Sequence, residues 1–358
     1  MPSLKEIKGR INSISSTLAI TSAMKMVAAA KLQKAQMAIQ NMLPYERRLY
    51  SMLLDLMGAM NISAAASEDG SVRGSGSAER GFDQSGDRLS LSNRHDLAGM
   101  DGAYSLMAQR EVRKVAIVAF ASNSSLCGAF NSNVIREATA VINEYRASGL
   151  GDADITVYSV GRKMAETMKK LGFPSPADFT KMSDSPSYDA ASALAQELLD
   201  GFVSGRFDKV ELVYNHYKST SSQPTTRQTY LPLSLTDATA DLQAGKIADS
   251  ASESDTNRGA EPVGAPVVRQ GSPTTEDLIV EPSKEALIAT LLPKVIRLRI
   301  FTTLLDSAAA EHAARTVAMQ LATDNGNDLL QELTLEYNKG RQQKITSEIL
   351  DLIGGSMQ

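Results

Sequence analysis

The chain has 358 residues, a formal net charge of −4 and one cysteine, Cys127. This length allows two or three domains with a full core, and a single cysteine excludes an internal disulfide or a thiolate metal cage. The mildly acidic balance gives no reason to expect nucleic-acid binding. Since there is no run of about 18 apolar residues, we expect a soluble cytoplasmic protein.

Residues 1–58 show the clearest periodicity. Ser3 is a plausible N-cap, with Glu6 as its capping-box partner, and the helix should pass Pro44 with a possible kink. Alternating steps of three and four give twelve positions, ten of them apolar, which is typical of a coiled-coil seam. These positions are Leu4, Ile7, Ile11, Ile14, Leu18, Thr21, Lys25, Ala28, Leu32, Ala35, Ile39 and Met42.

Thr21 and Lys25 interrupt this seam next to a run of small residues. They could simply set the register of the helix pair, or the pair could be narrow here because a partner encloses it. Residues 1–50 carry eight Lys or Arg and two Asp or Glu, a local net charge of +6. Such a basic face is either merely solvated or suited to acidic loops of a surrounding partner.

Two segments have the composition of linkers. Residues 59–110 include a stretch, 61–105, in which Gly and Ser supply sixteen of forty-five residues. Residues 237–277 contain several Gly and Pro that break regular structure. We expect both to be insertions outside the folded elements, because they hold too few large apolar side chains to offset the entropy of ordering.

Residues 111–236 alternate in type, which predicts a mostly parallel sheet with helices on both faces. Strands are expected at 115–120, 155–160 and 210–214, with an edge strand at 229–233. Helices are expected at 132–146, 162–171 and 188–203.

The loop 121–131 follows the first strand, where doubly wound folds bind phosphates. It lacks the spaced glycines and the Gly-Lys-Ser/Thr ending that phosphate loops need, which favours a tight structural turn. His95, His216 and His312 are far apart in sequence and form no metal or catalytic set; His312 next to Glu311 fits a seam or surface position better than a catalytic base. We expect no catalytic residue, cofactor or metal.

Residues 278–358 contain the longest helix, expected from Ser283 to Leu352. About seventy helical residues would span on the order of 100 Å, so this helix must leave the body of the protein. It should pair antiparallel with the first helix through Leu291, Leu298, Phe301, Leu305 and Ala308. The predicted fold is an α/β protein in which N- and C-terminal helices form a long antiparallel coiled coil with an inserted Rossmann-like α/β domain.

Both ends of the chain resemble the gamma subunits of F-type rotary ATP synthases. The resemblance covers residues 4–31 in the first helix, and 313–319, 322–326 and 337–346 in the last. Leu126-Cys127-Gly128 also matches, but Asn123-Ser124-Ser125 replaces the Asp-Arg-Gly usual before it, and Thr316 stands where methionine is common.

The resemblance implies a non-catalytic rotor shaft. It would stand in a ring of alpha and beta subunits, bind the epsilon subunit and the membrane c-ring, and lie peripherally on the cytoplasmic face of a bacterial cell membrane. Rotation driven by protons or sodium ions would change the contacts of each beta subunit in turn and so couple ion flow to ATP synthesis or hydrolysis.

The resemblance also implies contact residues. Arg341, Gln342 and Thr346 match polar contacts to a beta-subunit loop, unless they are only solvated helix polars. Met24 and Arg315 match a pair near a beta-subunit carboxylate loop, although Arg315 could instead pack within the coil.

Glu281 matches a residue near the membrane ring. Two other classes of protein remain as alternatives: a coiled-coil adaptor without rotation, and a nucleotide-binding α/β enzyme. The polar pattern around Arg341 disfavours the adaptor, and the absent phosphate loop disfavours the enzyme.

Overall fold

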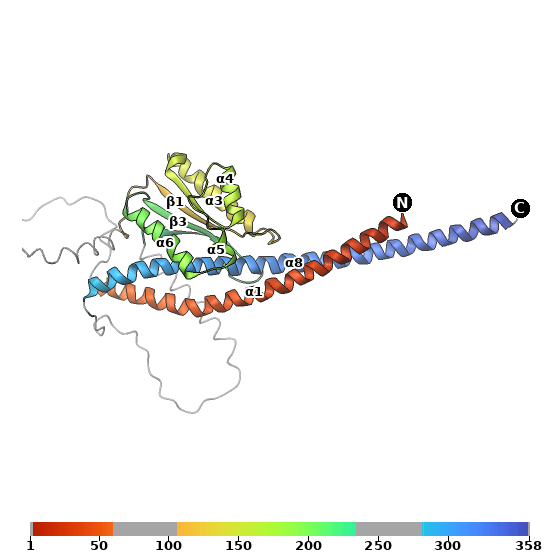
Figure 1. Ribbon diagram of the computed structural model, residues 1–358, viewed down its shortest axis with the longest axis horizontal. Coiled ribbons are helices and arrows are strands. Elements are labelled where there is room, and N and C mark those ends of the chain that lie inside the picture. The colour runs from red at the N-terminus through yellow and green to blue at the C-terminus, as the bar shows by residue number, and fades with distance from the viewer. Residues whose placement is uncertain (1–2, 60–105, 234–280, 282, 357–358) are drawn as a thin grey trace, which may run out of the picture.

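A computed structural model of the chain describes residues 3–59, 106–233, 281 and 283–356. Two long helices, α1 (Leu4–Ala59) and α8 (Lys284–Ser356), run side by side, and an α/β domain packs along the first half of α8 (Figure 1). At about 1.5 Å per residue, the 73 residues of α8 span roughly 110 Å. The predicted fold class is confirmed. The expected insertions, 59–110 and 237–277, lie largely outside the described residues.

The helix pair is antiparallel, with the N-terminus and the C-terminus at the same far end (Figure 1). All twelve seam positions expected in α1 are at least partly buried, and most positions between them are exposed. The Ser3 hydroxyl accepts from the Glu6 backbone N–H at 3.2 Å, which confirms the N-cap, and the helix continues through Pro44. The polar seam residue Thr21 accepts a hydrogen bond from Thr323 of α8 at 3.2 Å between the hydroxyl oxygens.

The sheet has four strands in the order β2-β1-β3-β4. Strands β1 (Val115–Phe120), β2 (Ile155–Val160) and β3 (Lys209–Asn215) are parallel, and β4 (Thr225–Leu231) is antiparallel at the edge. The expected edge strand at 229–233 is wrong at both ends. Polar residues from Thr225 onward already pair with β3, and the strand stops before Pro232, which has no N–H to donate.

Helices cover both faces of the sheet. One face packs against α3 (Phe130–Ala147) and α4 (Arg162–Lys170), and the other packs against α6 (Tyr188–Val203) and the first half of α8. Two short elements were not predicted, α5 (Thr180–Asp184) and the 3₁₀ turn Asp152–Asp154.

The first half of α8 lies between α1 and the sheet, so it is buried around most of its circumference. Phe301, which we expected to pair with α1, also packs edge-on against Tyr188 of α6, with ring centroids 5.8 Å apart. A helix with apolar residues on most of its sides has to be covered on most of its sides. The buried residues here are Ile288, Leu292, Val295, Ile296, Leu298, Ile300 and Leu304.

Candidate functional site

The functional surface that the sequence predicts is the projecting part of the helix pair, which we call the shaft: residues 4–30 of α1 with 315–356 of α8. Its seam continues with a heptad period through Thr323, Gly326, Leu330, Leu333 and Tyr337 to Gly340, each partly buried. Two glycines let the helices approach closely. A Cβ on Gly326 would lie 2.6 Å from Leu18 Cδ2, and one on Gly340 would lie 3.1 Å from Leu4 Cδ2.

Beyond Gly340, α8 has no helical partner within the described part of the chain. Residues 341–350 are all exposed, and α8 extends past the N-terminus of α1 (Figure 1). Residues 341–356 span about 24 Å at 1.5 Å per residue. Large apolar side chains on this tip are open to solvent, namely Ile345, Ile349, Leu350, Leu352 and Ile353.

Arg341, Gln342 and Thr346 all lie on this exposed tip. At about 100° per residue, they fall within roughly 140° of the helix circumference. The Thr346 hydroxyl donates to the Gln342 carbonyl oxygen at 2.9 Å, while no hydrogen bond or ion pair ties the Arg341 side chain to the part of the chain the structure describes. The three side chains can therefore meet a partner from one side.

The other three expected contact residues lie elsewhere. Met24 is on the outer face of α1, with 37% of its surface exposed. Glu281 is exposed and precedes α8 at the opposite end of the protein. Arg315 differs from both, because its side chain is only 12% exposed and turns toward the α/β domain.

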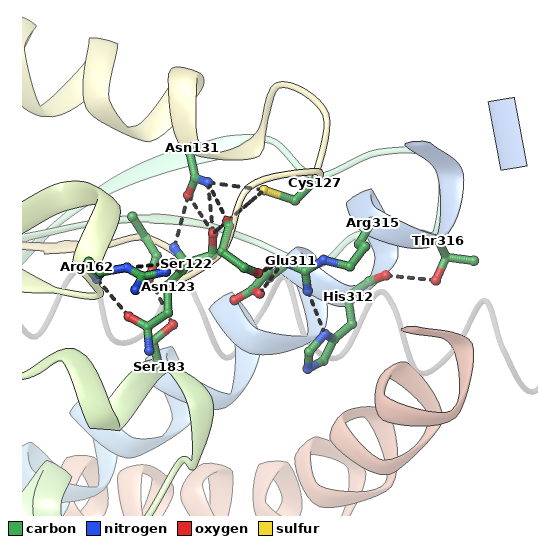
Figure 2. A network of polar contacts seen from close by, with 12 residues as sticks. Ser122, Asn123, Cys127, Asn131, Arg162, Ser183, Glu311, His312, Arg315 and Thr316 are labelled. Carbon is green, nitrogen blue, oxygen red and sulfur yellow. Dashed lines mark hydrogen bonds and ion pairs between the residues drawn. The ribbon is translucent and has the colours of Figure 1, made fainter. Parts of the chain in front are cut away.

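Arg315 belongs to a polar network between α8 and the loop 121–131 (Figure 2). Its guanidinium donates to Ser124 Oγ at 2.7 Å and pairs with Glu311 Oε1 at 2.8 Å. It also lies 3.4 Å from His312 Nδ1. Since an arginine can only donate, that ring nitrogen must be the acceptor, and His312 is neutral in this contact.

Burial shifts the pKa values of two groups in this network toward their uncharged forms. Burial lowers the pKa of His312 to about 4, and the positive charges of Arg315 and Lys31 act in the same direction. Burial also raises the pKa of Glu311, which the negative charge of Asp184 reinforces and Arg315 opposes. A cavity of about 10 Å³, enough for about one water molecule, lies between Glu311 and the ends of β1 and β2.

The loop 121–131 is filled by its own side chains, which supports the reading as a tight structural turn. Asn131 Oδ1 accepts from the Ser122 backbone N–H at 3.0 Å, and Asn131 Nδ2 lies 3.2 Å from Cys127 Sγ (Figure 2). Cys127 packs against Ala310 of α8, and Gly128 has a positive φ of 59°. No group of residues that could hold a metal ion occurs in the described ranges.

Comparison with known proteins identifies the family. The family model described as ATP synthase matches residues 3–357, and a protein named ATP synthase gamma chain from Phocaeicola vulgatus is 47% identical over the full length of both chains. The chain belongs to the ATP synthase gamma-chain family. A gamma chain from Bacteroides thetaiotaomicron is 45% identical, again over both full lengths.

A solved structure gives the fold independently of close sequence similarity. A chain of the mitochondrial ATP synthase of Euglena gracilis, in an assembly described as OSCP, F1 and c-ring, is 19% identical with a TM-score of 0.52. The alignment covers 99% of this chain and 93% of that one. Gamma chains form the central stalk of the F-type ATP synthase and are not its catalytic subunits, so this part of the expected function is confirmed.

Sequence reasoning missed the surroundings of Arg315. Ser124 lies 191 residues away in sequence, and the pair Glu311 and Arg315 has the spacing of an ordinary surface ion pair.

No helix in the described ranges has the length and hydropathy needed to span a membrane.

Proposed function

We propose that this chain turns inside a ring of alpha and beta subunits on the cytoplasmic face of a bacterial membrane. The single observation that carries the proposal is the unpartnered tip of α8, which exposes apolar and polar side chains together beyond Gly340. Soluble monomers rarely leave such a surface uncovered, and it therefore fits an enclosing partner.

Three of the apolar side chains of the tip form one stripe. Ile345, Ile349 and Leu352 are spaced at i, i+4 and i+7, with 47%, 50% and 74% of their surfaces exposed. This spacing places them on one face of the helix, which suits an apolar sleeve formed by the surrounding ring.

Polar residues on the tip supply the specific contacts. Arg341, Gln342 and Thr346 meet a polar loop of one beta subunit, and Met24 lies against a beta subunit lower on the shaft. Because the two helices are unlike and end at different heights, each beta subunit meets a different surface. Each contact favours one conformation of its subunit, and turning the shaft moves those preferences around the ring.

The opposite end of the protein contacts the membrane sector. Glu281 is exposed beside the start of α8, and we propose that this end binds the epsilon subunit and the ring of membrane subunits. Association with the membrane then occurs through the complex. The contact of Arg315 with a beta subunit stays a prediction. The Arg315 guanidinium already binds Ser124 and Glu311 within the chain.

The test is a rotation assay on the chain reconstituted with alpha and beta subunits and a bead fixed to the α/β domain. ATP should drive rotation in one direction. Arg341→Ala should lower the rate of ATP-driven rotation roughly tenfold, the size expected when a hydrogen bond to a charged group is lost. Lys344→Ala is the matched control, since it removes the same charge from the same tip, where Lys344 pairs with the exposed Glu348 at 3.7 Å.

Equal effects of the two variants would show that the tip acts through its net charge and not through Arg341. Absence of ATP-driven rotation in the unmodified complex would refute the proposed function as a whole. A nucleotide-binding titration on the isolated chain tests the enzyme alternative, for which we expect no binding.

A further inference from the structure

Arg315 lies on the shaft, yet its hydrogen-bonding groups are turned inward. The guanidinium reaches Ser124 Oγ, Glu311 Oε1 and His312 Nδ1, all within the chain, and the side chain is 12% exposed. Charge-assisted hydrogen bonds of this kind are roughly twice as strong as neutral ones. An arginine held in this way has little freedom to reach a neighbouring subunit.

The loop that Arg315 reaches needs support on its outer side. Ser124, Ser125 and Leu126 are exposed, and Leu126 has a φ of 69°, a backbone conformation that is unfavourable for a leucine. The bonds made by Asn131 hold the loop against α3 (Figure 2), whereas the bond from Arg315 ties the exposed Ser124 side chain to α8.

We infer that Arg315 is a positioning residue that, together with Glu311, fixes the loop 121–131 against α8. Glu311 holds the guanidinium in place from one turn earlier on the same helix, and neutral His312 accepts from its other nitrogen. The loop at the end of β1 and the base of the shaft then move as one unit. This role goes beyond the proposed contacts with the ring, because it lies entirely within the chain.

The chain contains a native probe for this arrangement. Cys127 is its only cysteine, lies in the loop and is 1% exposed, so a thiol reagent can reach it only when the loop opens. The measurement is the rate at which a maleimide labels Cys127 in the full-length chain within the assembled complex, followed by the intact mass of this chain.

Two variants each remove one side of the contact. Arg315→Gln replaces the charged guanidinium by a shorter, neutral amide, and Ser124→Ala removes the acceptor. Ser124→Ala is clean, because the bonds from Ser122 Oγ and Asn131 Nδ2 go to the Ser124 carbonyl oxygen and not to its side chain. Each variant should speed labelling roughly tenfold, as expected for the loss of a hydrogen bond to a charged group.

Two further variants serve as controls. Ser124→Thr keeps the hydroxyl on an exposed residue and should label at the rate of the unmodified chain. Arg146→Gln removes an arginine from the same domain, where it pairs with Asp152 near the start of β2, and should also leave the rate unchanged.

The double variant decides whether the two residues act together. Arg315→Gln with Ser124→Ala should label about as fast as either single variant, not a hundredfold faster, because both remove the same bond. The inference is overturned if Ser124→Ala labels like the unmodified chain, or if the two effects multiply. Should Arg315→Gln fail to assemble, Ser124→Ala alone still tests it.

A second measurement rests on the proposed function. Ser124→Ala and Arg315→Gln should lower proton pumping per ATP hydrolysed by similar factors. A loss confined to Arg315→Gln would assign that residue to a direct contact with a partner and overturn the inference. If the unmodified complex pumps nothing, the proposed function fails while the labelling result stands.

Discussion

Gly326 lies directly against Leu18 across the shaft, and replacing Gly326 by alanine tests whether this close approach is required. A Cβ at this position would lie 2.6 Å from Leu18 Cδ2 and 3.1 Å from Leu18 Cγ. The first distance is far inside van der Waals contact. Leu18 would have to leave its place in the seam, because both its methyl and its branch carbon face the new atom.

Two opposing free energies decide the result. Alanine is favoured over glycine in a helix interior by about 1 kcal/mol, and overpacking a seam typically costs about 1–3 kcal/mol. We therefore expect Gly326→Ala to destabilise the shaft by about 1 kcal/mol. Gly340→Ala is the matched control: its Cβ would lie 3.1 Å from Leu4 Cδ2 and 4.0 Å from Leu4 Cγ, so the alanine preference should dominate.

The assay is hydrogen exchange of shaft amides in the full-length chain, which reports local opening. Amides of residues 319–333 should exchange about fivefold faster in Gly326→Ala, the factor that corresponds to about 1 kcal/mol. Those around residue 340 should exchange more slowly in Gly340→Ala. If Gly326→Ala slows exchange as much as its control, Leu18 relaxes freely and the close approach does not constrain the helix pair.

Three other predictions concern charge. The pKa of His312 falls from 6.5 to about 4 in the folded chain, so protonation of this side chain favours unfolding. Stability is therefore full above pH 6.5 and is lost as the pH drops toward 4. His312→Gln should remove this pH-dependent part of the stability, which is about 2 kcal/mol. Denaturant unfolding from pH 4 to 7 checks this, and parallel curves for the variant and the unmodified chain would contradict it. Glu211→Gln should cost about 3 kcal/mol by denaturant unfolding, because Arg227 and Lys209 would lose their buried carboxylate partner; a loss below about 1 kcal/mol would be inconsistent with this reasoning. Met24→Lys should lower proton pumping per ATP while leaving ATP hydrolysis largely intact, and unchanged pumping per ATP would count against the contact.

The pattern of the shaft could be predicted because one rule determines it. Each step of three or four residues returns to the same side of a helix, so the seam from Leu4 to Met42 follows from the positions of apolar residues alone. The central parallel strands could be predicted for a similar reason, since apolar runs of strand length between helices indicate a buried sheet.

Elements with polar sequences were harder to predict. The first residues of β4, Thr225 to Gln228, lie on an edge strand and carry no apolar alternation, so only their pairing with β3 shows that they form a strand. The short helix α5 is too brief for a periodic signal. In both cases tertiary contacts determine the structure more than local sequence does.

The expected contact residues stay predictions, and the structure shows only how exposed each of them is. The exposure of Arg341, Gln342, Thr346 and Met24 agrees with a surface open to partners. The burial of Arg315 could not be predicted from the sequence, because its spacing from Glu311 is that of many solvated ion pairs on helices. The fold brings Ser124 to it, and only the packing of the α/β domain against α8 makes that possible.

The two ends of α8 meet opposite physical requirements on one continuous helix. Its first half is largely apolar and packs between α1 and the sheet, which anchors it. Its last turns are also rich in apolar residues, yet nothing in the described part of the chain covers them. Burying the first half fixes the direction of the helix, and exposing the tip leaves hydrophobic free energy available only to another protein. A stiff helix that is anchored at one end and exposes apolar side chains at the other can transmit a turning force along its length, and Arg315 lies where the anchored part ends.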